Sequence, residues 1–310
     1  MKIGLVAQIT EPESMPGLAR AVEALGFESL FMGEHTHMPV DTVHAYTGDS
    51  GQRSKGYVPD YYRRFPDPYA CLAAAAVATS RLRLGTCVAL PAEHPPLALA
   101  KTVATLDRLG AGRLVFGVGY GWNRLELENN GIDFAARHAV LREKILAMRE
   151  LWSRETATFA GEHVRFSECW SYPKPAQARI PVLLGAKLTP RAIRHIVEFC
   201  DGCIPVKTFE DGRLAEDLAA LRDAMRQAGR DPATLDVTIV EPSGSMAGKR
   251  SAQRFDEVLP APEWLGALER LGVTRVLLGL PLSSPELTAH AMARYAQHLG
   301  DRLTPQARAG

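Results

Sequence analysis

The sequence predicts an α/β fold in which eight parallel strands, each followed by a helix, close into one barrel spanning residues 1–310. Two observations support this prediction. Short aliphatic runs alternate eight times with segments whose apolar residues recur at helical spacing. Such alternation is typical of a parallel sheet, and eight units in 310 residues favour closure into a (β/α)8 barrel. An open, doubly wound sheet is the alternative topology.

In the first half of the chain, strands are expected where aliphatic and β-branched residues are concentrated. Two helix starts are marked by Asp67, a capping residue, and by the proline pair 95–96. A long helix with apolar residues at helical spacing is expected over 141–152. The expected strands are residues 3–9, 28–33, 82–90 and 113–119.

The second half of the chain repeats the same rhythm. Apolar stripes at helical spacing lie within residues 193–200, 214–225 and 264–271, and Pro285 opens the last helix. Each stripe follows a short aliphatic run that ends near a glycine, proline or charged residue. The expected strands are residues 180–185, 203–206, 235–241 and 274–280.

Two segments fall outside the repeat. Residues 36–66 follow the second strand, are rich in Gly, Pro, Tyr and Arg, and have no apolar period. A loop of this length at the carboxyl end of a strand predicts a lid over a substrate. Residues 156–177 contain two short alternating runs around Gly161-Glu162, which predict a small hairpin before the fifth strand.

Composition limits the classes of function. The chain is 46% hydrophobic and 23% charged, and its net charge of +1 comes from interspersed acids and bases. This balance favours neither a nucleic-acid surface nor a membrane patch. The N-terminal run resembles a strand more than a signal peptide, and no run reaches the ~20 apolar residues of a membrane span. Five scattered cysteines are consistent with a reducing cytoplasm, the expected location.

In a barrel of this kind, chemistry is expected at the carboxyl ends of the strands. The polar, glycine and aromatic residues at those ends are Gln8, Glu34, His35, Thr86, Cys87, Tyr120, Trp122, Asn123, Gly185, Lys187, Lys207 and Glu241.

The densest of these groups is the run Glu34–His37. A metal site built on its two histidines needs ligands from other strands, and residues 185–187, 205–207 and 281–283 contain neither His nor Asp. Proton transfer by His35 is the favoured interpretation, because imidazole titrates near neutral pH. The simpler alternative is that His35 only hydrogen-bonds a ligand or the backbone.

Three further motifs lie at or near the ends of the expected strands. The glycines of 117–121 lack the dinucleotide-binding spacing, and they favour close approach of a flat ring to the backbone. Residues 185–190 precede a helix, so their free N–H groups and Lys187 favour an anion such as phosphate. Cys200 and Cys203 have Cys-x-x-Cys spacing but are expected to be core residues.

Together these residues resemble the luciferase-like monooxygenase superfamily, in the branch of deazaflavin (coenzyme F420)-dependent oxidoreductases. The resemblance extends from Ile3 to about Tyr295. It implies a (β/α)8 barrel, a homodimer, and either coenzyme F420 or FMN as cofactor. The stretches that carry it are residues 84–88, 100–109, 112–119 with 121–122, and 170–175.

The resemblance also implies roles for individual residues. The ring of the cofactor is expected on a bulge in the third strand, with a cis peptide at Cys87–Val88. Glu34 and His35 are expected at the reacting end, where His35 would exchange a proton and Glu34 would orient it. The residues expected to contact the cofactor are Thr86, Cys87, Val88, Gly119, Tyr120, Gly185, Ala186, Lys187 and Lys207, of which Gly185, Ala186 and the two lysines would hold the phosphate.

The sequence departs from the sugar-phosphate dehydrogenases of that superfamily at two positions. Trp122 stands where they carry a catalytic Glu, and Pro39 stands where they carry a Trp. These departures favour an apolar or aromatic substrate, which His37 and Trp122 are expected to contact. The leading hypothesis is hydride transfer between coenzyme F420 and an organic substrate. The alternatives are an FMN-dependent monooxygenase and a cofactor-binding barrel without turnover.

Overall fold

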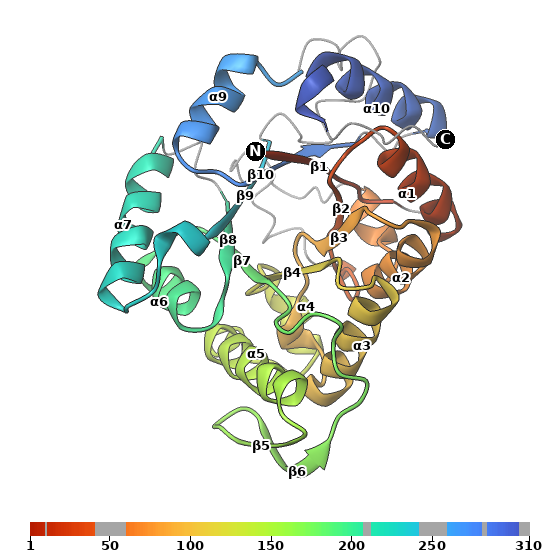
Figure 1. Ribbon diagram of the computed structural model, residues 1–310. Coiled ribbons are helices and arrows are strands. Elements are labelled where there is room, and N and C mark those ends of the chain that lie inside the picture. Colours follow the sequence, from red (N-terminus) through yellow and green to blue (C-terminus); the bar gives the residue numbers. More distant parts are fainter. Residues whose placement is uncertain (10, 41–59, 207–211, 242–258, 281–283, 304–310) are drawn as a thin grey trace.

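The computed structural model describes residues 1–303 except 10, 41–59, 207–211, 242–258 and 281–283. Eight parallel strands form a closed barrel, as predicted, and helices surround it (Figure 1). Their order around the barrel is β1-β10-β9-β8-β7-β4-β3-β2. The strands are β1 (Lys2–Val6), β2 (Ser29–Met32), β3 (Arg83–Thr86), β4 (Leu114–Gly119), β7 (Val182–Ala186), β8 (Gly202–Pro205), β9 (Asp236–Val240) and β10 (Arg275–Gly279).

The expected capping residues begin the helices. The Asp67 carboxylate accepts a hydrogen bond from the Ala70 N–H, and prolines occupy the first turns of both α2 and α3. The helices are α1 (Met15–Ala24), α2 (Pro68–Ala78), α3 (Pro96–Leu109), α4 (Arg124–Asn129), α5 (Arg137–Ser153), α6 (Pro190–Phe199), α7 (Leu214–Gln227), α9 (Pro262–Arg270) and α10 (Pro285–Leu299). Short 3-10 turns are η1 (Pro12–Ser14), η3 (Asp60–Arg64), η4 (Pro91–Glu93), η5 (Pro232–Thr234) and η7 (Gly300–Arg302). No helix in the described ranges is long and apolar enough to cross a membrane.

The core has two layers. The larger layer lies between the barrel and its helices, and it includes Cys200 and Cys203, which are fully buried and reduced, as expected. The smaller layer fills the barrel itself with six buried side chains, including Phe31. A Cβ at Gly85 would lie 2.2 Å from the Phe31 ring, so glycine is needed there because Phe31 fills the space.

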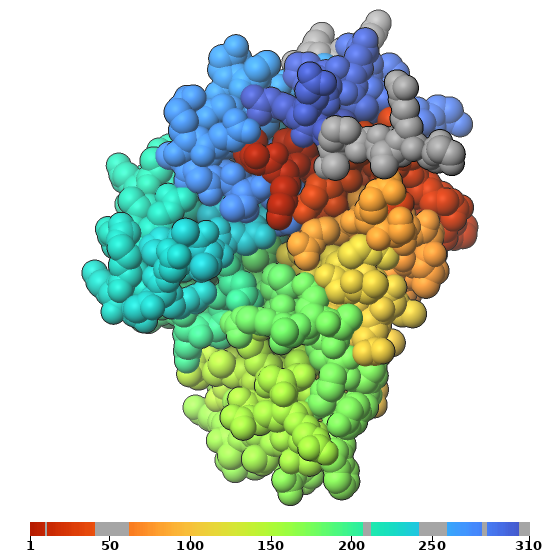
Figure 2. Space-filling view, in the orientation of Figure 1, coloured from red at the N-terminus to blue at the C-terminus, as the bar shows by residue number. Residues whose placement is uncertain are grey.

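The predicted hairpin is present. Strands β5 (Thr156–Ala160) and β6 (Arg165–Trp170) pair antiparallel and lie below α5 in Figure 1. The green and yellow-green region that contains this part of the chain forms the lower end of the molecule in Figure 2. The Glu143 carboxylate of α5 accepts N–H groups from Glu162, His163 and Val164, which ties the turn to the barrel. Most of the predicted lid, residues 41–59, lies outside the described residues, and η3 lies at its far end.

One short helix was not expected. The sequence predicted no helix directly after the glycine run of β4, yet α4 begins at Arg124, two residues after Trp122. The Asn123 side chain caps it by accepting the Glu126 N–H. The helix covers only six residues, which is too short for an apolar period to show in the sequence. It brings Glu126 to the carboxyl end of the barrel.

Candidate active site at the barrel mouth

A bulge follows β3, as the resemblance implied. Leu84 pairs with Leu114 and Gly85 with Val115, but Ala89 pairs with Val118. The segment from Gly85 to Ala89 therefore has one residue more than the segment of β4 opposite it. The Cys87–Val88 peptide bond within this bulge is cis, as predicted. The Cys87 N–H donates to the Met32 carbonyl at 2.6 Å, and the Glu34 N–H to the Val88 carbonyl at 3.2 Å. The bulge is thereby fixed between β2 and β4.

Glycines of neighbouring strands receive the Val88 side chain. A Cβ at Gly119 would lie 2.6 Å from Val88 Cγ2, and one at Gly185 would lie 2.4 Å from Val88 Cγ1. Val88 and Cys87 are only partly buried, and both pack on the side chains inside the barrel. Burial raises the pKa of the Cys87 thiol to about 12, so this cysteine stays protonated and is no nucleophile at neutral pH.

His35 is paired with Glu126 at the carboxyl end of β2. Its Nδ1 lies 2.7 Å from Glu126 Oε2, and Glu126 Oε1 accepts the Thr36 N–H at 2.9 Å. Both side chains are almost fully buried, at 6% and 1% exposure. A carboxylate at Nδ1 favours the tautomer with hydrogen on that nitrogen, which leaves the Nε2 lone pair for a substrate proton.

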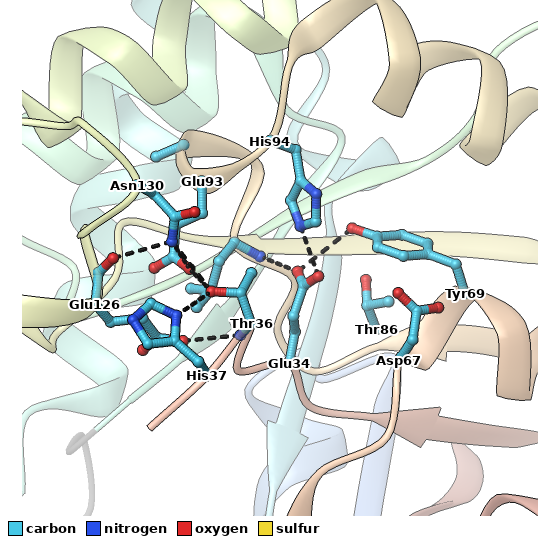
Figure 3. Close-up of polar contacts among 12 residues, drawn as sticks. Glu34, Thr36, His37, Asp67, Tyr69, Thr86, Glu93, His94, Glu126 and Asn130 are labelled. Carbon is cyan, nitrogen blue, oxygen red and sulfur yellow. Dashed lines mark hydrogen bonds and ion pairs between the residues drawn. The ribbon is translucent and has the colours of Figure 1, made fainter. Parts of the chain in front are cut away.

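Glu34 does not orient His35, contrary to the sequence-based expectation. Its Oε1 lies 2.7 Å from His94 Nε2, and its Oε2 accepts the Leu90 N–H at 2.6 Å and the Tyr69 hydroxyl at 3.4 Å. In Figure 3 Glu34 faces His94 and Tyr69, while Glu126 lies on the opposite side of Thr36. Both residues follow the end of β2 at Met32, and their partners come from different segments: Glu34 contacts residues 90 and 94, and His35 contacts α4. Glu34 therefore joins the end of the bulge to α2 and to the start of α3.

Aromatic rings surround the His35 imidazole. The ring centroids of Tyr62, Phe65 and Trp122 lie 5.2, 5.6 and 5.6 Å from that of His35. Tyr62 and Phe65 stack on each other at 5.4 Å. Trp122 was expected as an apolar wall of the site, but Tyr62 and Phe65 were missed because their segment has no period. The enclosure excludes water from one side of the imidazole and is suited to a flat, apolar substrate.

A third carboxylate, that of Glu93, is linked to the His35–Glu126 pair through Thr36. Its Oε2 accepts the Thr36 hydroxyl at 2.8 Å and the Asn130 amide at 3.2 Å, and its Oε1 is buried with no partner among the described residues (Figure 3). Burial and the negative charge of Glu126 raise the pKa of Glu93 to about 8. The group can therefore hold a proton near neutral pH. A lone glutamate before a proline pair gave no sequence signal of this arrangement.

Three further predicted residues, Thr86, Tyr120 and His37, each have different hydrogen-bond partners. The Thr86 hydroxyl is fully buried and donates to the Gly117 carbonyl at 2.6 Å, so it serves the sheet. The Tyr120 hydroxyl lies 2.9 Å from His195 Nδ1 on α6. His37 is exposed, and its Nε2 lies 2.9 Å from the Asn129 amide.

The residues expected to hold a phosphate are only partly described. Gly185 and Ala186 end β7 half-buried, Lys187 is exposed directly after them, and Lys207 lies outside the described residues. Among the residues that the structure describes, no three His, Cys, Asp or Glu side chains are grouped to hold a metal ion.

Three glycines and a buried side-chain amide lie beside the bulge, and the Val88 side chain fills the space in front of Gly119 and Gly185. Gly33, Gly119 and Gly185 present no side chain beside the bulge. Gln8, just after β1, has a buried Oε1 without a hydrogen-bond partner among the described residues, and a Cβ at Gly33 would lie 3.7 Å from its Nε2. A buried acceptor without a partner is rare in folded proteins, and a donor on a bound ring would satisfy it.

The closed barrel, the bulge after β3 and the side chains at the carboxyl end of the barrel are the features to compare with known families. The sequence profile of the luciferase-like monooxygenase family matches residues 2–301, so the chain belongs to that family. Proteins similar to this chain in sequence or in fold include enzymes named as F420-dependent and a riboflavin lyase solved with modified FMN.

Individual relatives support the same assignment. An uncharacterised protein of Mycobacterium tuberculosis is 39% identical over 306 residues, which are 98% of this chain and 99% of that protein. An F420-dependent glucose-6-phosphate dehydrogenase of Nakamurella multipartita is 31% identical over 234 residues, 74% of this chain and 62% of that enzyme.

Two solved structures share the fold. A monooxygenase from Streptomyces bottropensis superposes with a TM-score of 0.74 at 23% identity, covering 96% of this chain and 98% of that one. An F420-dependent secondary alcohol dehydrogenase in complex with an F420–acetone adduct has a TM-score of 0.70 at 18% identity, covering 95% and 97%.

Proposed function

We propose that this protein transfers a hydride between coenzyme F420 and an apolar or aromatic organic substrate. The observation that carries the proposal is the buried His35–Glu126 pair, which stands beside the bulge of β3 inside an aromatic enclosure. Bound coenzyme F420 would supply the hydride acceptor or donor. The relative named as an F420-dependent dehydrogenase supports this cofactor.

The residues of the chain have distinct tasks in this proposal. The glycines beside the bulge and Gln8 would hold the ring, and Gly185, Ala186, Lys187 and Lys207 would hold the phosphate. His35 would accept the hydroxyl proton of an alcohol through Nε2 as the substrate is oxidised, or donate it to a carbonyl in the reverse direction. Glu126 would stabilise the resulting imidazolium.

The aromatic enclosure limits the substrate. Tyr62, Phe65 and Trp122 occupy the space around His35 without adding a formal charge, so a sugar phosphate would find no cation among them. An apolar or aromatic carbon skeleton beside the reacting carbon is favoured instead. His37, which is exposed and hydrogen-bonded to Asn129, would contact the outer part of such a substrate.

The first prediction is tight binding of coenzyme F420. Titration of the purified protein, followed by absorbance, should give a dissociation constant in the micromolar range or lower, because Lys187, directly after β7, offers a cation to the phosphate. FMN, titrated in parallel, should bind more weakly. Tight FMN binding without measurable deazaflavin binding would identify the flavin-dependent alternative and contradict the proposal.

The second prediction is a homodimer. The family resemblance implies one, and exposed apolar side chains lie on α2 and α3 outside the barrel, including Val77 and Leu109 at 71% and 47% exposure. Covering them would remove apolar surface from water. Light scattering at micromolar concentration should give twice the mass of the 33.8 kDa chain. A monomer under these conditions would contradict the prediction.

A further inference from the structure

A buried carboxyl group beside the His35–Glu126 pair has no task in the proposed reaction. This group belongs to Glu93, which is 8% exposed and forms no ion pair within the described residues. Its Oε2 accepts the Thr36 hydroxyl at 2.8 Å, and the same threonine donates its N–H to Glu126 Oε1 at 2.9 Å. Because one residue joins the two carboxyl groups, the charge of Glu93 acts on Glu126 at short range.

The surroundings of Glu93 favour its neutral form. Its Oε1 is buried without a hydrogen-bond partner among the residues that the structure describes, and an ionised oxygen in that position would be costly. Lys144 of α5 donates to the carbonyls of the residues before and after Glu93, and not to its carboxyl group. Burial, with smaller contributions from the charges of Glu126 and Glu34, raises the pKa of Glu93 to about 8 against the opposing charge of Lys144.

Thr36 also connects Glu93 to the surface of the protein (Figure 3). Its hydroxyl lies 3.0 Å from Nδ1 of His37, an exposed side chain whose Nε2 lies 2.9 Å from the Asn129 amide nitrogen. Since that amide donates to Nε2, the hydrogen of a neutral His37 is on Nδ1 and points at Thr36. The hydroxyl can give its own proton to Glu93 as it accepts the one from His37, which then takes another from solvent.

We propose that Glu93 stores a proton beside the His35–Glu126 pair, so that the pair keeps the single negative charge of Glu126. The store is filled from solvent through Thr36 and His37, and Glu93 is a positioning residue that acts on the reaction through the pair. This inference rests on the proposed function, in which His35 both takes up a proton and releases it. One carboxylate balances an imidazolium, whereas a second ionised carboxylate would hold the proton on His35 and slow its return.

The test follows the His35 imidazole by NMR in protein labelled at histidine, without cofactor or substrate. The His35 signals are identified by their absence from His35→Gln. In the wild type, ionisation of Glu93 should shift these signals in a step near pH 8, and Glu93→Gln, whose amide has the shape of the protonated acid, should lose that step. Glu162→Gln, which changes an exposed carboxylate on the β5–β6 turn, should titrate like the wild type.

A further variant tests the link through Thr36. Thr36→Val has nearly the same shape but lacks the hydroxyl, and that hydroxyl lowers the pKa of Glu93 by hydrogen-bonding its ionised form. The step in the His35 signals should therefore move about half a pH unit or more higher in this variant.

Chemical denaturation provides a second, independent measurement. Because the pKa of Glu93 is raised from 4.5 to about 8, the folded protein retains a proton that the unfolded chain loses between these values. The stability of the wild type relative to Glu93→Gln should therefore fall as the pH rises through this range and level off above it. The ratio of their unfolding equilibrium constants should change by up to about 10-fold per pH unit.

The outcomes separate this inference from the proposed function. A relative stability that stays constant between pH 4.5 and about 8 overturns the inference, and so does a His35 titration that Glu93→Gln leaves unchanged. An unchanged step in Thr36→Val overturns the route through Thr36. Failure of the proposed function would appear instead in the titrations with coenzyme F420 and FMN, because the NMR and denaturation measurements contain neither cofactor.

Discussion

Replacing His35 by alanine is expected to lower turnover about 10²-fold or more and to leave the fold intact. In the proposed function the imidazole takes up the substrate proton, and the Glu126 carboxylate, 2.7 Å from its Nδ1, fixes its orientation. An alanine cannot take up the proton, whereas the bulge and the glycines that would bind the cofactor are untouched. Steady-state turnover with any accepted substrate, together with cofactor titration, measures both effects.

Matched variants sharpen this test. Glu126→Gln should lower turnover about 10-fold or more, because a neutral amide stabilises an imidazolium less than a carboxylate does and its single oxygen can accept only one of the two N–H groups that Glu126 accepts. His163→Ala, an exposed histidine on the β5–β6 turn, should leave turnover unchanged. If His35→Ala turns over substrate like the wild type, His35 only supports the site and another group moves the proton.

Replacing Arg275 by methionine is expected to lower the free energy of unfolding by about 3–5 kcal/mol. The guanidinium of Arg275 is completely buried at the start of β10. It donates to both oxygens of Glu28 at 2.9 and 3.0 Å, and to Asp236 and Thr238 at 3.2 and 3.0 Å. Without it, two largely buried carboxylates lose their counter-charge. Chemical denaturation of the variant and the wild type measures the difference.

The ion cluster of Arg275, Glu28 and Asp236 also predicts that the stability of the fold depends on pH. Burial alone would raise the pKa of Glu28 and of Asp236, but hydrogen bonds and charge from Arg275 lower both below their ordinary values of 4.5 and 3.8. Carboxylates with lowered pKa stabilise the fold above those values, and this stabilisation is lost as the pH falls through the lowered pKa. The difference between wild type and Arg275→Met should therefore shrink below about pH 4.

A surface variant provides the comparison. Arg154→Ala removes an exposed ion pair with Glu150, which should cost at most about 1 kcal/mol. An equal loss in both variants would mean that the buried cluster adds nothing beyond an ordinary surface pair. If Arg275→Met is as stable as the wild type, packing of the methionine side chain at the start of β10 compensates for the lost ion pairs.

Local sequence patterns were sufficient to predict the barrel, since its strands and long helices each depend on residues close together in the chain. The aliphatic runs and capping residues are short-range signals, and they located all eight strands of the described barrel. The end of the second strand also gave His35 a position at the mouth, because parallel strands end at one rim. The bulge and its cis peptide came from the family resemblance, and the structure places both at Cys87–Val88.

Which side chains of the candidate site are in contact depends on the tertiary structure. Glu34 and His35 are neighbours in sequence, yet Glu34 contacts His94 before α3, and the partner of His35 comes from α4, 91 residues away. Tyr62 and Phe65 reach His35 from a segment with no period. Arg191 of α6 contacts His138 of α5, which lies 53 positions earlier in the sequence. Such contacts depend on where closed strands and packed helices bring distant residues, and no local pattern encodes that distance.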